Sequence, residues 1–231
     1  MKYLCIKIQN VRRNGQKIRY ITMKKVEHLL ARKLLDITAI KLQPDNPFTW
    51  GSGWVSPIYT DSRKILSYPE VRTFVKTEIS RVILENFPGV ECLAGVATGA
   101  IAHGALAADQ LGLPYCFVRL TPKDHGLENL IEGTVKLGQK IVVIEDNLST
   151  AHSSLKVMET LEQAGCEVLG EVAIFDFGFV AAEAALRAKG VKLFSLTNFD
   201  AMVDAALGIN FITQEDAEAL RSWHNDPEMW S

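Results

Sequence analysis

Apolar segments of strand length alternate with helical segments between residues 92 and 195 of this chain, and this pattern constrains its fold most strongly. Three glycines, Gly112, Gly165 and Gly190, each follow an expected helix, where chains often leave a helix through the left-handed region. The alternation predicts an α/β fold with a mostly parallel central sheet and helices on both faces. Strands are expected at residues 92–95, 115–119, 140–144, 167–175 and 192–195, and helices at 100–111, 153–164 and 180–189.

The chain upstream of residue 92 has a different pattern. Helical spacing of apolar residues predicts helices at 23–39 and 69–86, and alternating aromatic and small residues predict a hairpin at 48–61. Residues 1–22 are basic and have no apolar segment of a secretory signal. We expect them to be an extension, either disordered or upstream of a true start at Met23. Residues 198–231 are expected to form one or two helices.

Composition limits the class of protein. A chain of 231 residues with 48% hydrophobic content is long enough for one sizeable core. Its formal net charge of −2 implies no broad attraction to nucleic acid or to a membrane surface, and no apolar run approaches the roughly 20 residues of a membrane span. The four cysteines are scattered without CxxC spacing, so we expect buried free thiols in a reducing cytoplasm.

The segment 141–154 carries the strongest functional signal. It reads Ile141-Val-Val-Ile-Glu-Asp-Asn-Leu-Ser-Thr-Ala-His-Ser-Ser154, an apolar strand that leads into two acids, a hydroxyl-rich loop and a helix. Loop amides and the positive end of a helix suit a phosphate group, and paired carboxylates can accept hydrogen bonds from vicinal sugar hydroxyls. The alternative is an ordinary buried strand whose acids cap the next helix, but such a strand rarely needs two adjacent acids. The segment therefore predicts a site for a phosphorylated sugar.

Two further loops belong to the same prediction. The small-residue loop at 95–100 follows a strand, and strands of an open parallel sheet bind ligands at their carboxyl ends, so it is expected on the same rim. A tight turn explains that loop about as well when it is taken alone. The long polar segment 120–133 brings Arg119, Lys123 and His125, which can stabilise negative charge, although a solvated surface loop is the simpler alternative.

Three motifs resemble those of a known family. Residues 141–154 resemble the phosphoribosyl-diphosphate (PRPP) binding motif of type I phosphoribosyltransferases, with Asn147 where an apolar residue is usual and His152 where Gly is common. Lys123-Asp-His-Gly126, preceded by Arg119, resembles the catalytic loop of orotate phosphoribosyltransferases. Residues 48–57 resemble the hood segment that covers the orotate ring in that family. The matches span about residues 23 to 180.

The resemblance implies a fold and an activity. The fold is the type I phosphoribosyltransferase fold, with a single domain at 23–231 that comprises a small N-terminal hood (about 23–65) and a core (about 66–231). The activity is the conversion of orotate and PRPP to orotidine 5′-monophosphate and diphosphate in UMP biosynthesis, with Mg²⁺ as cofactor. Mg²⁺ would bridge diphosphate and ribose oxygens, and no direct protein ligand is assigned. A homodimer that shares the 120–133 loop across subunits is also implied.

Site residues follow from the matched positions. The catalytic residues implied are Lys123, Asp124, His125 and Asp146. The PRPP-binding residues implied are Arg119, Lys123, His125, Glu145, Asp146, Asn147, Leu148, Ser149, Thr150, Ala151, His152 and Ser153. The orotate-binding residues implied are Phe48, Ser52, Ile58, Tyr59, Arg63 and Ser149.

The chain also departs from the family at three positions. Many members have a Lys at the positions of Gly51 and Gly99, and an Arg that contacts the orotate carboxylate at the position of Phe177. Arg63 is a candidate substitute for that Arg, or else a surface residue.

Other functions remain open at this point. They are a type I phosphoribosyltransferase that uses a different base, and a non-catalytic PRPP-binding regulator. A dinucleotide-binding dehydrogenase fits less well, because no G-x-G-x-x-G follows the first core strand. The chain is too short for a fusion with orotidylate decarboxylase, which would add a barrel of roughly 250 residues.

Overall fold

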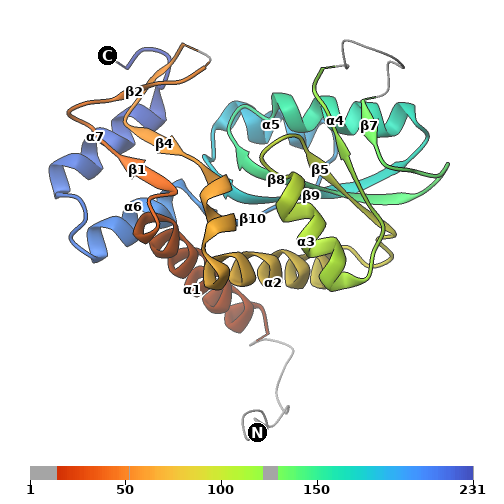
Figure 1. Ribbon diagram of the computed structural model, residues 1–231. Coiled ribbons are helices and arrows are strands. Elements are labelled where there is room, and N and C mark those ends of the chain that lie inside the picture. Colours follow the sequence, from red (N-terminus) through yellow and green to blue (C-terminus); the bar gives the residue numbers. More distant parts are fainter. Residues whose placement is uncertain (1–14, 52, 122–129, 231) are drawn as a thin grey trace, which may run out of the picture.

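A six-stranded sheet forms the centre of the molecule (Figure 1). The computed structural model describes residues 15–51, 53–121 and 130–230, and for residues 15–24 it describes the backbone alone. The strand order is β10-β9-β8-β5-β6-β7, and every neighbouring pair is parallel except β6–β7. The strands are β5 (Cys92–Val96), β6 (Tyr115–Val118), β7 (Ile131–Glu132), β8 (Lys140–Leu148), β9 (Glu167–Asp176) and β10 (Leu193–Asn198).

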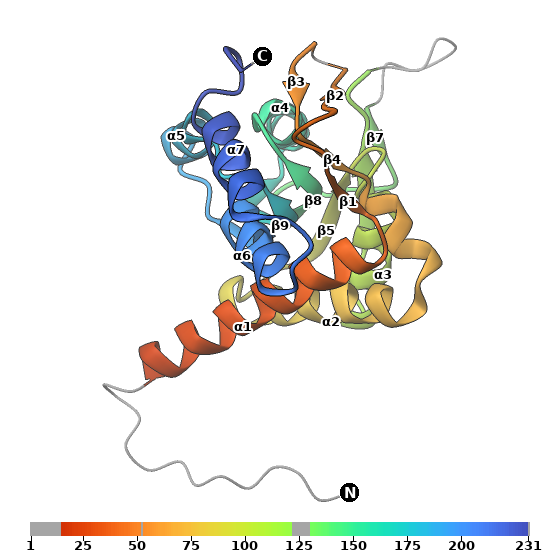
Figure 2. The same cartoon turned by 90° about the vertical axis from the view of Figure 1, so that its left-hand side faces the viewer.

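Helices cover both faces of this sheet. In Figures 1 and 2, α1 (Gly15–Asp36), α2 (Pro69–Asn86) and α3 (Ile101–Leu111) run below the sheet. On the opposite side lie α4 (His152–Gln163) and α5 (Val180–Ala188). Every residue of β5 is buried, as a strand covered on both faces should be. The expected α/β architecture is therefore confirmed.

The hood is built from both ends of the described chain. β1 (Ile40–Leu42) pairs with β4 (Ile58–Thr60), and β2 (Phe48–Thr49) pairs with β3 (Val55–Ser56), both antiparallel. The 3₁₀ helix η1 (Ser62–Ser67) follows β4. The C-terminal helices α6 (Phe199–Gly208) and α7 (Gln214–Asn225) lie beside α1 and the hood strands (Figures 1 and 2). The Trp223 indole N–H of α7 donates to the Val55 carbonyl at 3.0 Å, which ties the C-terminal region to the hood.

Several elements differ from their expected bounds. α1 begins at Gly15 instead of Met23, because no Gly or Pro interrupts the helical residues between them. β8 continues through the acidic pair to Leu148, because Glu145 and Asn147 still pair with β9. The expected hairpin at 48–61 forms only in part: β2 and β3 pair with each other, whereas β4 pairs with β1 in a separate sheet. The short strands β1 and β7 were not expected.

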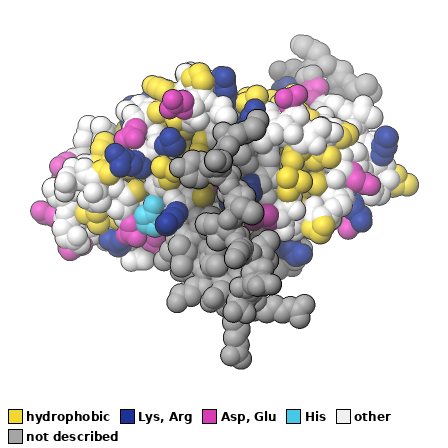
Figure 3. Space-filling model, turned by 90° about the horizontal axis from the view of Figure 1, so that it is seen from below, with side chains coloured by type: hydrophobic (Ala, Val, Ile, Leu, Met, Phe, Trp, Pro, Cys, Tyr) yellow, Lys and Arg dark blue, Asp and Glu magenta, His cyan; other side chains and the backbone are white. Residues whose placement is uncertain are grey.

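The surface agrees with the near-zero net charge. Seen from below, Lys and Arg side chains are interspersed with Asp and Glu side chains, and no single sign dominates that face (Figure 3). No described helix is long and apolar enough to cross a membrane.

Candidate active site

The two small-residue loops predicted to share a rim are in contact. The loop after β5 contains the cis peptide bond Ala97–Thr98, followed by Gly99. A Cβ placed on Gly99 would overlap the carboxylate of Asp146, which lies near the end of β8. Gly99 therefore allows the backbone of one loop to approach the acid of the other, where any larger residue would push them apart.

The acidic pair has two different environments. Asp146 is partly exposed, and its Oδ2 accepts a hydrogen bond of 2.7 Å from the Asn147 amide. Glu145 is only 5% exposed, and its Oε1 accepts the Asp146 backbone N–H at 2.9 Å. Burial, the neighbouring Asp146 and the nearby Glu171 raise the pKa of Glu145 well above its usual value. Asp146 is thus the carboxylate of the pair that a ligand can reach at the surface of the cleft.

A third acid, Glu171, lies behind this pair and was not among the expected site residues. It comes from the middle of β9, is fully buried, and accepts a hydrogen bond of 2.5 Å from the Ser154 hydroxyl. Burial raises its pKa to about 7, against the opposing effect of the Ser154 hydrogen bond. The sequence signal for it was a single charged residue inside an otherwise apolar strand segment.

The hydroxyl-rich loop forms a small pocket at the start of α4. Ala151 precedes the helix with a left-handed backbone (φ 60°), and its side chain makes no capping bond. The first-turn amides of a helix have no intrahelical partners, so they can bind an anion. His152 is exposed, whereas the Leu148 side chain is buried in the core. The pocket has a volume of about 30 Å³ and is lined by Glu145, Asn147, Leu148, Ser149, Thr150, Ala151, His152, Ser153 and Ser154.

A larger cavity of about 450 Å³ lies between the hood and the end of β8. Its walls are mainly aromatic, with the Trp50 ring 6.2 Å from Trp54 and 5.1 Å from Phe177 between centroids. A few polar side chains at one edge and aromatic walls suit a flat heterocyclic ligand. The lining residues are Thr49, Trp50, Gly51, Trp54, Tyr59, Thr60, Asn147, Ser149, Thr150 and Phe177.

The residues expected to contact the base are only partly brought together. Tyr59 and Ser149 line the cavity. Phe48 lies outside the lining with its ring 5.5 Å from Tyr59, and Ile58 is fully buried with its carbonyl accepting the Trp50 indole N–H at 2.9 Å. Six lining residues were not among the expected site residues, although Trp-rich spacing in the hood was a signal for two of them: Thr49, Trp50, Gly51, Trp54, Thr60 and Phe177.

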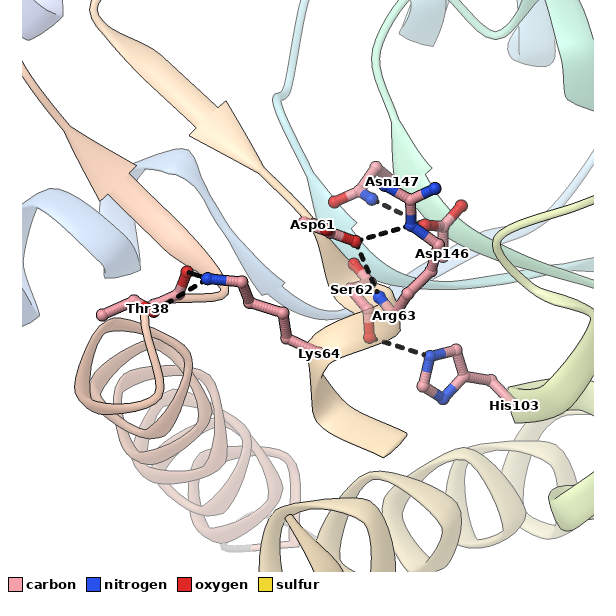
Figure 4. A network of polar contacts seen from close by, with 8 residues as sticks. All are labelled: Thr38, Asp61, Ser62, Arg63, Lys64, His103, Asp146 and Asn147. Carbon is pink, nitrogen blue, oxygen red and sulfur yellow. Dashed lines mark hydrogen bonds and ion pairs between the residues drawn. The ribbon is translucent and has the colours of Figure 1, made fainter. Parts of the chain in front are cut away.

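Arg63 is placed beside the acids and outside the cavity lining (Figure 4). Its Nε lies 2.7 Å from Asp61 Oδ1, and its guanidinium extends from η1 toward Asp146 and Asn147. The hydrogen bond from Arg63 lowers the pKa of Asp61. The Arg63 side chain is 64% exposed, so it remains accessible to an anionic ligand while Asp61 holds its position.

The element that carries Arg63 is anchored on two sides (Figure 4). His103 of α3 donates from Nε2 to the Ser62 carbonyl at 3.1 Å, and burial lowers the pKa of His103, so the ring is neutral at pH 7. On the other side, Lys64 Nζ bonds the carbonyl and hydroxyl oxygens of Thr38 at 3.1 and 2.9 Å. Arg63 is therefore presented by a segment that is fixed both to α3 and to the turn that follows α1.

The remaining expected residues lie at or beyond the edge of the described chain. Arg119 follows β6, and its Nη1 is 4.0 Å from Glu132 Oε1 of β7. Ser52, Lys123, Asp124 and His125 lie outside the described residues. Among the described residues, no group of three or more His, Cys, Asp or Glu side chains could hold a metal ion.

Comparison with known proteins agrees with this geometry. Residues 65–199 match the phosphoribosyl transferase domain family. The orotate phosphoribosyltransferase of Phocaeicola vulgatus is 57% identical over 208 residues, which cover 90% of this chain and 98% of that protein. The corresponding protein of Listeria monocytogenes serotype 4b is 46% identical over 205 residues, covering 89% of this chain and 98% of the relative.

Solved structures agree as well. Orotate phosphoribosyltransferase from Aeropyrum pernix has a TM-score of 0.69 at 26% identity, covering 80% of this chain and 99% of that one. The UMP synthase of Leishmania donovani has a TM-score of 0.76 at 25% identity; the match covers 91% of this chain and 44% of that longer one. The chain belongs to the orotate phosphoribosyltransferase family of type I phosphoribosyltransferases.

Proposed function

We propose that this protein is an orotate phosphoribosyltransferase, which transfers the 5-phosphoribosyl group of PRPP to N1 of orotate and releases diphosphate. One observation carries the proposal beyond family membership: three residues, Asn147, Ser149 and Thr150, line both the aromatic cavity and the small pocket at α4. A base in the cavity and a phosphate in the pocket would therefore lie on either side of the same segment. The sugar that joins them would lie over Asp146.

The described groups match the chemistry that such a transfer requires. The anomeric carbon of the ribose gains positive charge as the bond to diphosphate lengthens, so catalysis depends on positioning and electrostatic stabilisation. Asp146 would accept hydrogen bonds from the ribose hydroxyls and lie near that positive charge. The α4 amides with the Ser149, Thr150 and Ser153 hydroxyls would hold the 5′-phosphate, and the aromatic walls would hold the pyrimidine ring.

The diphosphate would be held by residues on either side of the cleft. Gly99 gives its loop close access to Asp146, and backbone amides of such a loop can bind phosphate oxygens. Arg119, Lys123 and His125 are proposed to neutralise the leaving group on the strength of the sequence resemblance. Arg63, beside Asp146, is proposed to contact the orotate carboxylate.

We propose that Mg²⁺ accompanies PRPP. Since the described residues include no metal-binding cluster of carboxylates, histidines or cysteines, an ion held mainly by substrate oxygens and water fits this site. The ion would neutralise charge on the diphosphate. We also propose a cytoplasmic homodimer in which the 120–133 segment reaches the partner's site, and light scattering of the purified protein tests the dimer.

The deciding experiment is orotate-dependent release of diphosphate from PRPP in the presence of Mg²⁺. We expect turnover with orotate and none with adenine, hypoxanthine or uracil. Turnover with one of those bases instead would identify a different phosphoribosyltransferase. Binding of PRPP without turnover of any base would identify a regulator.

A further inference from the structure

Three buried polar side chains form a chain beneath the first turn of α4. Ser154 lies between the two acids, with its Oγ 2.5 Å from Glu171 Oε1 and 3.3 Å from Glu145 Oε2. All three residues are buried, and they come from α4, β9 and β8. The second oxygen of Glu171 has no hydrogen-bond partner among the described residues. A helix turn, two strands and two carboxyl groups thus meet at one hydroxyl.

In the described part of the chain, no cation is among the groups that shift the pKa of either buried acid. The charged groups that act on Glu145 and Glu171 are Asp146 and Asp176, which are also acidic. The ionisable side chains on the first two turns of α4 are those of His152, Lys156 and Glu159, and all three are exposed. Two ionised carboxylates without a counter-ion are strongly disfavoured in such a buried site, so the cluster holds at least one proton near neutral pH.

The hydrogen-bond geometry is consistent with a proton on Glu171. A serine hydroxyl can accept one hydrogen bond while it donates another. The Ser154 hydroxyl donates to Glu171 Oε1 when that acid is ionised. With a proton on Oε1 the direction of this bond would reverse, so that Glu171 donates to Ser154 Oγ and Ser154 donates to Glu145 Oε2. The unpartnered Glu171 Oε2 is then a neutral carbonyl oxygen, which costs less to bury than a charged one.

The three hydrogen-bonded side chains of Glu145, Ser154 and Glu171 lie next to the phosphate pocket. Ser154 belongs to the first turn of α4, and both Ser154 and Glu145 line the pocket at its N-terminus. Ala151 offers no side-chain cap, so the Ser154 bonds anchor this turn to the sheet in its place. An ionised Glu171 would add a negative charge directly below a site proposed for a phosphate.

We propose that Glu171 is a positioning residue that retains a proton beneath the phosphate loop and, through Ser154, holds the first turn of α4 in its ligand-binding position. The inference rests on the proposed function, because PRPP is the ligand whose phosphate would occupy the pocket. It has a consequence that a purely structural role lacks. PRPP should bind more tightly to the protein in which Glu171 is protonated, so its affinity should decrease as Glu171 ionises.

The test is calorimetric titration of PRPP with Mg²⁺ into the unmutated protein and Glu171→Gln, at about pH 6 and about pH 8.5. The Gln amide can donate a hydrogen bond to Ser154, as protonated Glu171 would, or accept one from it, but it cannot ionise. We expect the dissociation constant of the unmutated protein to increase about tenfold more over this range than that of the variant, which corresponds to a shift of one pKa unit on binding. Protonation of PRPP itself changes the dissociation constants of both proteins equally, so it cancels when the two increases are compared.

Two further variants separate titration from packing. Glu167→Gln, at the exposed start of the same strand, is the matched control and should behave as the unmutated protein. Ser154→Ala breaks the link to both acids and should weaken PRPP binding about tenfold at both pH values, with circular dichroism confirming the fold.

The outcomes are distinct. Equal pH dependence in the unmutated protein and Glu171→Gln would overturn the inference while leaving the proposed function intact. Unchanged PRPP affinity in Ser154→Ala would overturn the anchoring role. If the unmutated protein does not bind PRPP at all, the proposed function fails and the inference fails with it.

Discussion

The α-carbon of Gly99 lies so close to the Asp146 carboxylate that a methyl group on Gly99 would overlap the carboxylate carbon and both of its oxygens. The loops after β5 and β8 therefore meet without an intervening side chain. The carboxylate of Asp146 occupies the space in which a Cβ on residue 99 would lie. Glycine at position 99 is thus a packing requirement of this site.

Gly99→Ala should displace Asp146 and impair the enzyme without unfolding it. A displacement of about 1 Å in a catalytic group can reduce the rate about a hundredfold, and we expect kcat/KM for PRPP to decrease by that order. Steady-state kinetics with orotate in excess measure the effect. Gly208→Ala is the control, because no atom lies within 4 Å of its added Cβ. A kcat/KM for Gly99→Ala equal to that of Gly208→Ala would show that the contact has no catalytic importance.

Local sequence signals predicted the parallel core of the sheet and the rim of the site. Strand and helix periodicities are short-range properties, and the rule that ligands bind at the carboxyl ends of strands places residues 95–100 and 145–154 together. The contact between Gly99 and Asp146 confirms that placement.

The hood and the buried acid cluster could not be predicted in the same way. Trp223 resembles any other apolar helical residue in sequence, and its bond to Val55 spans 168 positions of the chain. Glu171 finds its partner Ser154 at a separation of 17 residues and on a different element. Tertiary contacts of this kind do not produce a periodic pattern in the sequence. The aromatic cavity and the hydrogen-bonded cluster of Glu145, Ser154 and Glu171 are therefore found only in the three-dimensional structure.

Lys123→Ala should decrease kcat strongly and leave the fold intact. The residue lies outside the described part of the chain, so this expectation rests on the resemblance of Lys123–Gly126 to a catalytic loop. Loss of one group that stabilises transition-state charge costs on the order of a hundredfold to a thousandfold. Diphosphate release at saturating substrates measures it. An activity within twofold of the unmutated enzyme would exclude Lys123 from catalysis.

Trp223→Phe should loosen the hood. The substitution retains most of the buried ring but removes the N–H that donates to Val55, leaving that carbonyl without its partner. We expect a loss of about 1 to 3 kcal/mol in the free energy of unfolding and a severalfold increase in the KM for orotate. Met229→Ala, which removes an exposed apolar side chain near the same end of the chain, should change neither. An unchanged KM for orotate together with decreased stability would show that the Trp223–Val55 hydrogen bond stabilises the fold but does not affect base binding.

Arg63→Ala tests the proposed contact with the orotate carboxylate. Hydrogen bonds to charged groups contribute about 1.5 to 3 kcal/mol, so we expect the KM for orotate to increase about tenfold or more. Arg63→Lys should recover part of this loss by restoring the charge without the planar guanidinium. Arg32→Ala, on the exposed side of α1, is the control. Kinetics indistinguishable from the control would identify Arg63 as a surface residue.

Glu171→Gln should also change the pH dependence of stability in a defined direction. Burial raises the pKa of Glu171 from 4.5 to about 7. Between these values the folded protein binds a proton that the unfolded chain releases, so stability decreases as pH rises through this window. The decrease attributable to Glu171 is about 3 kcal/mol, and a Gln side chain does not contribute it.

Urea unfolding at a series of pH values measures this difference. The free energies of the two proteins should be similar near pH 4.5 and diverge as the pH approaches about 7, where the variant should be the more stable by about 3 kcal/mol. Burial and Asp146, the larger causes of the raised pKa of Glu145, are the same in both proteins, and loss of the Glu171 charge in the variant removes only the smaller third cause. For Glu167→Gln, at an exposed position of β9, the difference in free energy of unfolding from the unmutated protein should not change with pH. A flat difference for Glu171→Gln as well would mean that Glu171 is ionised in the folded protein, and that the proton of the cluster belongs to Glu145.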